Sequence, residues 1–259
     1  MFEHLLTSGS RRVARLWRSK RHEMRNSAPL VSFTFDDVPE SAYINGATIL
    51  EALGVRGTFY IASGQCGWDN RVMGWRVIDR EHVKALYDDG HEIGCHTFSH
   101  PRVDQIDTRA LEEECSRNRD TLREVCSGIE LTNFCYPFGR LSLGPKRYLQ
   151  QRFDSCRGTY RGINAGIIDL GLLKVIPLYN QTLTDDQLQR VLRKTRERNG
   201  WLIFYAHDVT ESPSSIGCSP QLLRATVQAA QAAGMQCLPI RTALAAVGYA
   251  NGRIPVEVN

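Results

Sequence analysis

Short apolar runs and longer amphipathic stretches alternate along this chain from residue 30 to residue 247. The apolar runs predict strands at residues 30–35, 57–62, 91–95, 133–136, 153–157, 173–177, 201–206 and 235–239. Apolar residues near a 3.6-residue period predict helices at residues 42–53, 79–89, 107–126, 185–199, 220–233 and 242–247. This alternation favours a parallel sheet covered by helices. Seven or eight such units in about 230 residues close into a barrel more easily than they lie flat, and chemistry then belongs at the carboxyl ends of the strands.

The chain is long enough for one large α/β domain. Its 259 residues are 42% hydrophobic and 23% charged, which is ordinary for a globular protein. No apolar run approaches the ~18 residues of a membrane span, and the basic N-terminus lacks the apolar core of a secretory signal. We therefore expect one domain over residues 29–259, preceded by a basic extension over residues 1–28.

Positive charge is concentrated in that extension. Residues 1–26 hold seven basic and two acidic side chains, a net charge of +5, whereas the whole chain carries +4. The rest of the chain is therefore close to neutral. A neutral body argues against nucleic-acid binding, which would require a basic face.

The extension also has an apolar face, because its apolar residues fall near one side at helical spacing. They are Phe2, Leu5, Leu6, Val13, Leu16 and Trp17. Two interpretations are open. Residues 1–26 are a strap that buries this face on the body, or they contact anionic lipid at the membrane surface, where each basic residue contributes roughly 1 kcal/mol.

Eight cysteines are present, and none forms a C-x-x-C pair. A structural zinc site or a thioredoxin-like motif is therefore not expected. Because a secretory signal is lacking, we expect reduced thiols in a cytoplasmic protein rather than four disulfides.

The segment GHEIGCHTFSHP, residues 90–101, places His96 and His100 four residues apart. Side chains at this spacing are neighbours on one turn, and two imidazoles at that distance can share one metal ion. The alternative is a pair of surface histidines that are close by chance. Pro101 disfavours a long helix here, so we expect a strand, one tight turn and a loop.

Two adjacent carboxylates, Asp36 and Asp37, end the first predicted strand in the segment SFTFDDVP. One aspartate there could simply cap a turn, but two at a strand end suggest chemistry. Asp37, His96 and His100 would form a facial triad with open positions for water and substrate. Asp36 could then act as a base on a water whose pKa the metal lowers.

The segments TFDD, HEIGCHTFSH, FCYPFG and FYAHD together resemble the polysaccharide deacetylases of the NodB-homology type, carbohydrate esterase family 4. Their order and spacing fit from about residue 30 to residue 240. The resemblance implies a distorted (β/α) barrel of about seven strands that hydrolyses N-acetyl groups on amino sugars. It also implies a divalent metal, with Zn²⁺ first and Co²⁺, Mn²⁺ or Ni²⁺ as alternatives.

The same resemblance implies roles for individual residues. Asp36 matches the catalytic base, and Asp37, His96 and His100 match the metal ligands. His207 matches the histidine that protonates the leaving amine.

The segment CYPFG matches the loop that lines the substrate groove in this family. Pro137 and Phe138 are therefore candidate substrate-binding residues. The backbone N–H of Tyr136 is the candidate donor to the tetrahedral oxyanion.

Two departures from the family pattern concern arginine. Many members carry arginine where this chain has Cys135, and the family's fourth motif is replaced by DSCRGTYRGIN. Arg157 could orient the base or bind an anionic substrate group, or it could form a structural ion pair with Asp36 or another carboxylate. Arg161 is a further candidate for substrate binding.

We expect a metal-dependent N-deacetylase whose substrate is an intermediate of surface polysaccharide biosynthesis. The alternatives are a metal-dependent hydrolase of a non-sugar amide and a non-catalytic carbohydrate-binding protein. Trp68 and Trp75 could stack on a sugar ring or pack locally. The sequence predicts neither the identity of the sugar nor the oligomeric state.

Overall fold

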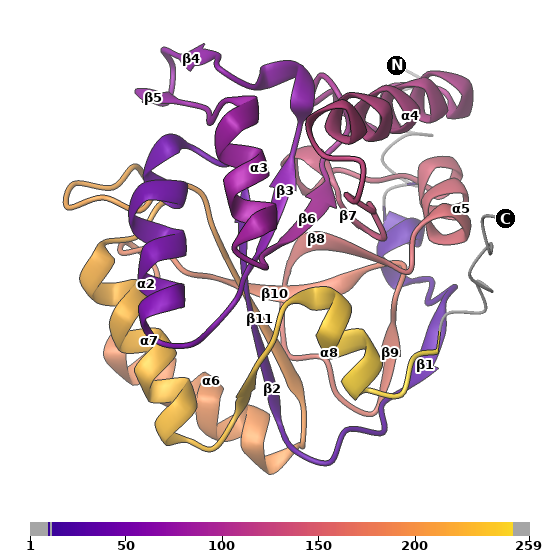
Figure 1. Ribbon diagram of the computed structural model, residues 1–259. Coiled ribbons are helices and arrows are strands. Elements are labelled where there is room, and N and C mark those ends of the chain that lie inside the picture. Colours follow the sequence, from indigo (N-terminus) through magenta and orange to yellow (C-terminus); the bar gives the residue numbers. More distant parts are fainter. Residues whose placement is uncertain (1–9, 11, 251–259) are drawn as a thin grey trace, which may run out of the picture.

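The computed structural model describes residue 10 and residues 12–250 of the chain. Phe2, Leu5 and Leu6, part of the predicted apolar face, lie outside the described residues. The described chain forms a barrel of parallel strands with helices on its outside (Figure 1).

Seven parallel strands form the barrel, and β11 closes it by pairing with β2. In spatial order they are β2 (Leu30–Asp36), β3 (Thr58–Ile61), β6 (Glu92–Cys95), β7 (Asn133–Cys135), β8 (Ser155–Arg161), β10 (Leu173–Pro177) and β11 (Trp201–Ala206). A short strand, β12 (Gln236–Cys237), pairs with the first residues of β2, whereas β3 pairs with its last residues. The predicted barrel of about seven strands is confirmed.

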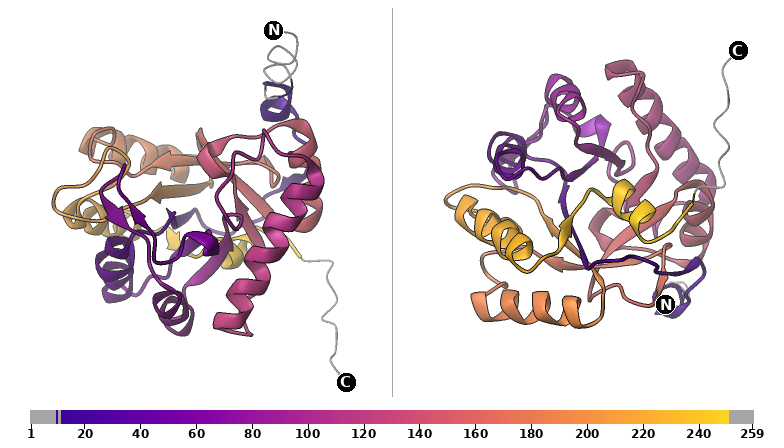
Figure 2. Two further views of the ribbon diagram at one scale, coloured as in Figure 1. Left: turned by 90° about the horizontal axis from the view of Figure 1, so that it is seen from above. Right: turned by 60° about the horizontal axis from the view of Figure 1, so that its bottom comes forward.

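The helices lie around the strands in both views of Figure 2. They are α2 (Thr48–Ala52), α3 (Arg80–Asp88), α4 (Thr108–Val125), α5 (Leu143–Arg152), α6 (Asp185–Glu197), α7 (Pro220–Ala232) and α8 (Ile240–Ala246). Asp79, Asp107, Thr184 and Ser219 accept hydrogen bonds from the first backbone N–H groups of α3, α4, α6 and α7. These side chains satisfy N–H groups that have no partner inside a helix.

Alternate residues of the strands point either outward, toward the helices, or into the barrel. Val31, Phe33 and Phe35 of β2 belong to a buried apolar cluster with residues of the surrounding helices. Successive strand residues point to opposite faces, so Asp36 points into the barrel. There Arg157 of β8 lies over the ring of Tyr60 of β3, a strand that β8 does not pair with. The barrel therefore brings polar side chains of distant strands together inside it.

Several local predictions need correction. The predicted helix at residues 42–53 begins as a π-helix, Ala42–Ala47. The predicted strand at residues 235–239 is reduced to β12. Helix α5 and the hairpin β4 (Asp69–Asn70) with β5 (Trp75–Arg76) were not predicted. Their segments are short or, in α5, contain Gly144 and Pro145, so they lack a clear hydrophobic period.

The described part of the N-terminal extension is packed on the body. Its strand β1 (Arg21–Glu23) pairs with β9 (Ile167–Asp169), and the two lie side by side in Figure 1. Ala14 is fully buried, and the buried Lys146 of α5 donates to the backbone carbonyls of Ala14 and Trp17 at 2.9 and 2.6 Å. The extension thus lies against the body, but Trp17 of its predicted apolar face is 39% exposed, so the face itself is not buried as the strap interpretation expects. Val13 and Leu16 also remain 50% and 75% exposed.

None of the helices described is long and apolar enough to cross a membrane. All eight cysteines are free thiols.

Candidate metal and catalytic site

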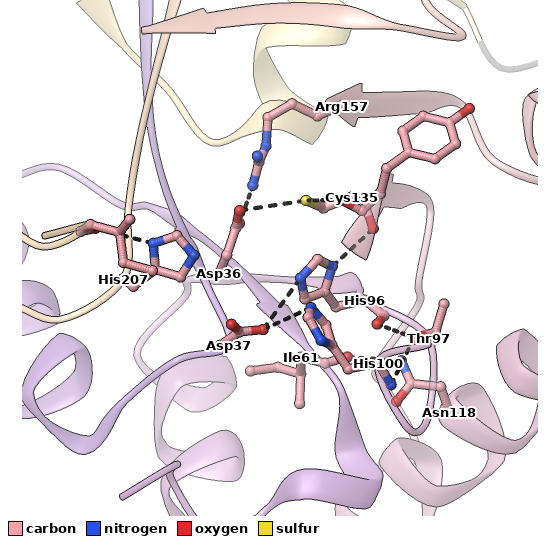
Figure 3. A network of polar contacts seen from close by, with 12 residues as sticks. Asp36, Asp37, Ile61, His96, Thr97, His100, Asn118, Cys135, Arg157 and His207 are labelled. Atoms are coloured by element: carbon pink, nitrogen blue, oxygen red, sulfur yellow. Dashed lines mark hydrogen bonds and ion pairs between the residues drawn. The ribbon is translucent and has the colours of Figure 1, made fainter. Parts of the chain in front are cut away.

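The candidate residues meet at the carboxyl ends of the barrel strands. Asp36 is the last residue of β2, and His96 and His207 directly follow β6 and β11. Since the carboxyl ends of parallel strands share one end of a barrel, these side chains converge there. In Figure 3 dashed lines join Asp37 to the imidazoles of His96 and His100, which lie together on one side of it, and His207 lies on the other side.

Asp37, His96 and His100 lie close enough together to hold one metal ion. The Oδ1 atom of Asp37 is 3.4 Å from Nε2 of His96 and 3.2 Å from Nε2 of His100. This Oδ1 is buried and has no hydrogen-bond partner among the described residues. A buried carboxylate oxygen without a donor is costly, and a cation shared with two imidazoles would satisfy it. The residues therefore fit a divalent metal.

The pKa shifts of Asp37 and His100 also fit metal binding. Burial acts to raise the pKa of Asp37, but the adjacent imidazoles of His96 and His100 lower it far below its usual range. Burial and the charge of His96 lower the pKa of His100 to about 4. At neutral pH the first is an ionised carboxylate and the second a neutral imidazole, the forms that bind metals. For His96 burial lowers the pKa, but Cys135 and Asp37 outweigh it and raise that pKa, so a metal ion would displace a proton there.

Contacts outside the triad fix the two imidazoles. Nδ1 of His96 donates to the carbonyl oxygen of Cys135 at 2.8 Å, which leaves Nε2 directed at Asp37. Glu114 of α4 accepts hydrogen bonds from the backbone N–H groups of Phe98 and Ser99 at 2.9 and 2.8 Å. Glu114 thus anchors the loop that carries His100. No motif in the sequence indicates this contact.

Backbone strain is concentrated at the site. Six described residues other than glycine have a positive φ angle, and five of them surround the triad: Asp37, Val38, Thr97, His100 and Phe138. Such conformations cost of order 1–3 kcal/mol each and persist only where the surroundings enforce them. Their grouping indicates that the packing imposes the site geometry, because such positions gather at functional sites.

Asp36 forms a buried ion pair with Arg157 through Oδ1 and Nη2. The guanidinium lies between two rings, 4.8 Å from the centre of Tyr60 and 5.3 Å from that of Tyr205. Burial alone would raise the pKa of Asp36, but the charges of Arg157, His96 and His207 outweigh it and leave that pKa below its usual value. Asp36 is therefore ionised and held in one orientation.

The position of this arginine explains the departure at Cys135. Cys135 of β7 and Arg157 of β8 are register partners on adjacent parallel strands. Sγ of Cys135 lies 3.6 Å from Oδ2 of Asp36, whereas Arg157 contacts Oδ1 of the same carboxylate. In this chain, an arginine from the strand next to Cys135 therefore contacts Asp36.

A second group of possible ligands, Asp36, His96 and Cys135, also lies within reach of one ion. Asp36 is already paired with Arg157, and burial raises the pKa of the Cys135 thiol, which keeps it protonated. A protonated thiol is not a metal ligand. The group that contains Asp37 is the better candidate.

His207 faces the same cavity. Its Nδ1 lies 3.1 Å from the carbonyl oxygen of Ile216, and its ring is stacked near Trp75 with centroids 6.0 Å apart. Asp208 accepts two hydrogen bonds from Ser214 at 2.8 and 2.6 Å, which shapes the loop that ends near Ile216. The contact at Nδ1 leaves Nε2 of His207 available for a substrate.

The cavity that contains these groups has a volume of about 470 Å³, within the range of small-ligand sites. Asp36, Asp37 and the three histidines line it together with an aromatic wall. That wall consists of Trp68, Trp75, Tyr136, Phe138, Tyr179 and Tyr205. The two tryptophans come from the β4–β5 hairpin region and face the cavity.

The backbone N–H of Tyr136, the expected donor to the oxyanion, is not free. Its N–H donates to the carbonyl oxygen of Arg157 at 2.9 Å, because the ladder between β7 and β8 continues to this residue. Its hydroxyl donates to the carbonyl of Gly171 at 3.1 Å. Phe138, by contrast, lines the cavity, is 60% exposed, and has its ring 4.4 Å from that of His100.

Two other residues expected to contact the substrate do not line the catalytic cavity. Pro137 is buried at the start of the 3₁₀ turn Pro137–Gly139 and does not line the cavity. Arg161 lines a separate cavity that shares no residue with the catalytic one. Regular alternation would place Arg161 with Thr159, which lines the catalytic cavity. The register of β8 against β10 shifts between Arg157 and Arg161, so alternation is interrupted before Arg161.

Comparisons with known proteins agree with this geometry. Residues 23–151 match the family model described as polysaccharide deacetylase. A chitin deacetylase of Arthroderma benhamiae is 25% identical over 108 residues, which are 42% of this chain and 27% of the fungal protein. The chain thus spans well under two thirds of that relative.

Solved structures share the barrel at low sequence identity. A peptidoglycan N-acetylglucosamine deacetylase superposes with a TM-score of 0.61 at 17% identity, covering 89% of this chain and 94% of the other. A family 4 acetyl xylan esterase from Clostridium thermocellum, solved with a cobalt ion, gives a TM-score of 0.59 at 17% identity, covering 83% and 90%. The solved structures show that the chain shares their fold, and the match of residues 23–151 to the family model assigns it to the polysaccharide deacetylase family.

Proposed function

We propose that this chain hydrolyses the N-acetyl group of an amino sugar with a bound divalent metal. One observation carries the proposal: the two adjacent carboxylates at the end of β2 have different partners. Asp37 faces two imidazoles with an unpaired buried oxygen, and Asp36 is held by Arg157. A metal-ligand carboxylate beside a fixed base suits the attack of a water on an amide.

Asp37, His96 and His100 would hold the ion through one carboxylate oxygen and two imidazole nitrogens. Three protein ligands of these kinds leave coordination positions open, as in catalytic zinc sites. Zn²⁺ is the first choice, with Co²⁺, Mn²⁺ and Ni²⁺ as alternatives. When bound, the ion would polarise the acetyl carbonyl and lower the pKa of a water molecule.

The chain's own residues then move the protons. Asp36 takes a proton from the attacking water as the water oxygen adds to the acetyl carbon, and Arg157 keeps this carboxylate ionised and oriented. His207 donates a proton to the amine nitrogen as the C–N bond breaks. The products are acetate and a free amino sugar.

The backbone donor to the oxyanion is the N–H of Phe138 in place of that of Tyr136. Phe138 follows a proline at the start of a one-turn 3₁₀ helix, where N–H groups have no partner within the helix. It also lines the catalytic cavity beside His100. A donor in that position would stabilise the charge that develops on the carbonyl oxygen.

The aromatic wall of the cavity favours a sugar substrate, since tryptophan and tyrosine rings pack on the apolar faces of sugars. The substrate in this proposal is a lipid-linked or nucleotide-linked intermediate of surface polysaccharide biosynthesis. Eight free thiols agree with a reducing compartment such as the cytoplasm.

A peripheral membrane contact through residues 1–26 is part of the same proposal. The exposed Val13 and Leu16 and the basic residues of the extension support it. Replacing both exposed residues (Val13→Ser with Leu16→Ser) should weaken co-sedimentation with anionic vesicles and leave hydrolysis of a soluble sugar unchanged. If the unaltered chain does not co-sediment with such vesicles at low salt, the contact is excluded.

Acetate release separates the proposed activity from its alternatives. Zn²⁺-loaded protein is incubated with a chitin oligosaccharide and, in parallel, with N-acetylated amino acids. Release from the sugar alone is expected. Release from the amino acids alone would favour a hydrolase of non-sugar amides, and sugar binding without release would favour a carbohydrate-binding protein.

A further inference from the structure

A second cavity, of about 460 Å³, lies between the N-terminal extension and the body. It is built from segments far apart in sequence: the extension, β8, β9, β10 and the end of α6. Five basic side chains line it, namely Arg15, Arg18, Arg161, Lys174 and Arg198. We refer to it as the basic cavity.

The positive charge of the basic cavity is not neutralised from within the described chain. None of the five basic side chains forms an ion pair with another described residue. Asp169 is the one carboxylate in the lining. Its Oδ2 accepts from Nζ of Lys146 at 2.6 Å, and its Oδ1 accepts from the N–H groups of Lys20 and Gly171 at 3.1 and 3.0 Å. Both oxygens of Asp169 therefore already accept hydrogen bonds from groups outside the five basic side chains.

The basic cavity also has the mixed lining of a ligand site. Leu172 and Ile168 are buried in its wall, and Tyr160 presents a ring with the Arg15 guanidinium 4.8 Å from its centre. Arg18 is held at the rim by a hydrogen bond from Nη1 to the carbonyl of Ile167 at 3.3 Å. Basic groups around an apolar floor favour an anion with an attached organic group.

The basic cavity is separate from the site that would hold the acetyl group of the substrate. The two cavities share no lining residue: of β8, Thr159 lines the catalytic cavity, whereas Tyr160 and Arg161 line the basic one. An anion bound here therefore cannot be part of the reacting centre.

We propose that the basic cavity binds a phosphate or diphosphate group. Four arginines provide planar donor pairs that match phosphate oxygens, and Lys174 adds a point charge. A diphosphate carries more negative charge than a carboxylate, so it matches five cations better. The group belongs either to a soluble phosphorylated compound or to a lipid headgroup, for which the nearby exposed Leu16 and Ile167 would provide an apolar border.

Calorimetric titration of the full chain with sodium pyrophosphate at low ionic strength tests the site. The test variant is Lys174→Gln with Arg198→Gln, and the control is Arg190→Gln with Arg224→Gln, two exposed arginines outside the cavity. Both pairs remove the same charge. We expect about tenfold or weaker binding in the test variant, because charge-assisted hydrogen bonds are lost, and unchanged binding in the control. Melting curves check that both variants fold.

Equal affinity in the two double variants would overturn the proposal, because it would show binding at the metal site or by net charge alone. Absence of pyrophosphate binding to the unaltered chain would overturn it as well. Titration with uridine diphosphate and co-sedimentation with phosphatidylglycerol vesicles then identify the source of the phosphate. In either assay, the loss of binding must again be confined to the test variant.

Discussion

Replacing Arg157 with methionine tests whether this arginine supports the base or merely fills space. The side chain is fully buried, contacts Asp36, and lies between the rings of Tyr60 and Tyr205. Methionine keeps part of the volume and removes the charge, so Asp36 is left as an unpaired buried carboxylate. Breaking one side of a buried ion pair costs about 3–5 kcal/mol.

For a chain of this size a change of that magnitude lowers the melting temperature by about 2–4 °C per kcal/mol, which gives a drop of roughly 6–20 °C. Urea unfolding followed by circular dichroism measures the free energy directly. The double variant Arg157→Met with Asp36→Asn has no buried charge at this position. It should recover most of the lost stability, because replacing both members of a buried pair is often neutral.

Arg193→Met is the matched control. Arg193 lies on the surface of α6 with Glu197 at 3.7 Å, so its loss should cost less than about 1 kcal/mol. The reasoning is refuted if Arg157→Met is as mild as this control. It is also refuted if the double variant is as unstable as Arg157→Met alone.

Three other predictions address the metal, the acid and a buried glutamate. Zn²⁺ at a hundredfold excess over its Kd should stabilise the protein by about 2.7 kcal/mol and raise its melting temperature, whereas Asp37→Ala should show no shift; equal shifts would exclude Asp37 as a ligand. His207→Ala should retain metal but release acetate about 10²–10⁴ times more slowly. Recovery of that rate at lower pH would contradict direct proton donation by His207. Burial raises the pKa of Glu92 despite its hydrogen bonds from Arg241 N and Asn133. Its contribution to stability is therefore full below its unfolded pKa of about 4.3 and is lost as pH rises through its higher folded pKa. The stability deficit of Glu92→Gln in urea unfolding should accordingly shrink from pH 4 to pH 7, and a constant deficit would contradict this.

The barrel and the grouping of Asp37, His96 and His100 could be predicted because their signals are local. Each buried strand is a continuous apolar run, and the triad residues directly follow two of these runs. The carboxyl-end rule for parallel strands then brings Asp37 and the two histidines together without knowledge of other contacts.

The remaining contacts depend on pairings that the chain pattern does not encode. Arg157 and Asp36 are 121 residues apart, so only the order of strands across the barrel makes them neighbours. The N–H of Tyr136 is used because β7 and β8 pair one residue beyond the strand. Arg161 lies in the basic cavity because the register of β8 shifts before it and the extension packs nearby, and neither feature has a signal in the local sequence.

The most direct test of the account is a parallel measurement of bound metal and acetate release in Asp36→Asn and His96→Ala. The unaltered protein should bind one equivalent of metal and release acetate from an N-acetylglucosamine oligosaccharide. Asp36→Asn should keep the metal and lose at least about 10²-fold in rate, since it removes the base and keeps the ligands. His96→Ala should lose both. If Asp36→Asn stays within a few-fold of the unaltered rate, or if His96→Ala keeps full metal and activity, the central claim is wrong.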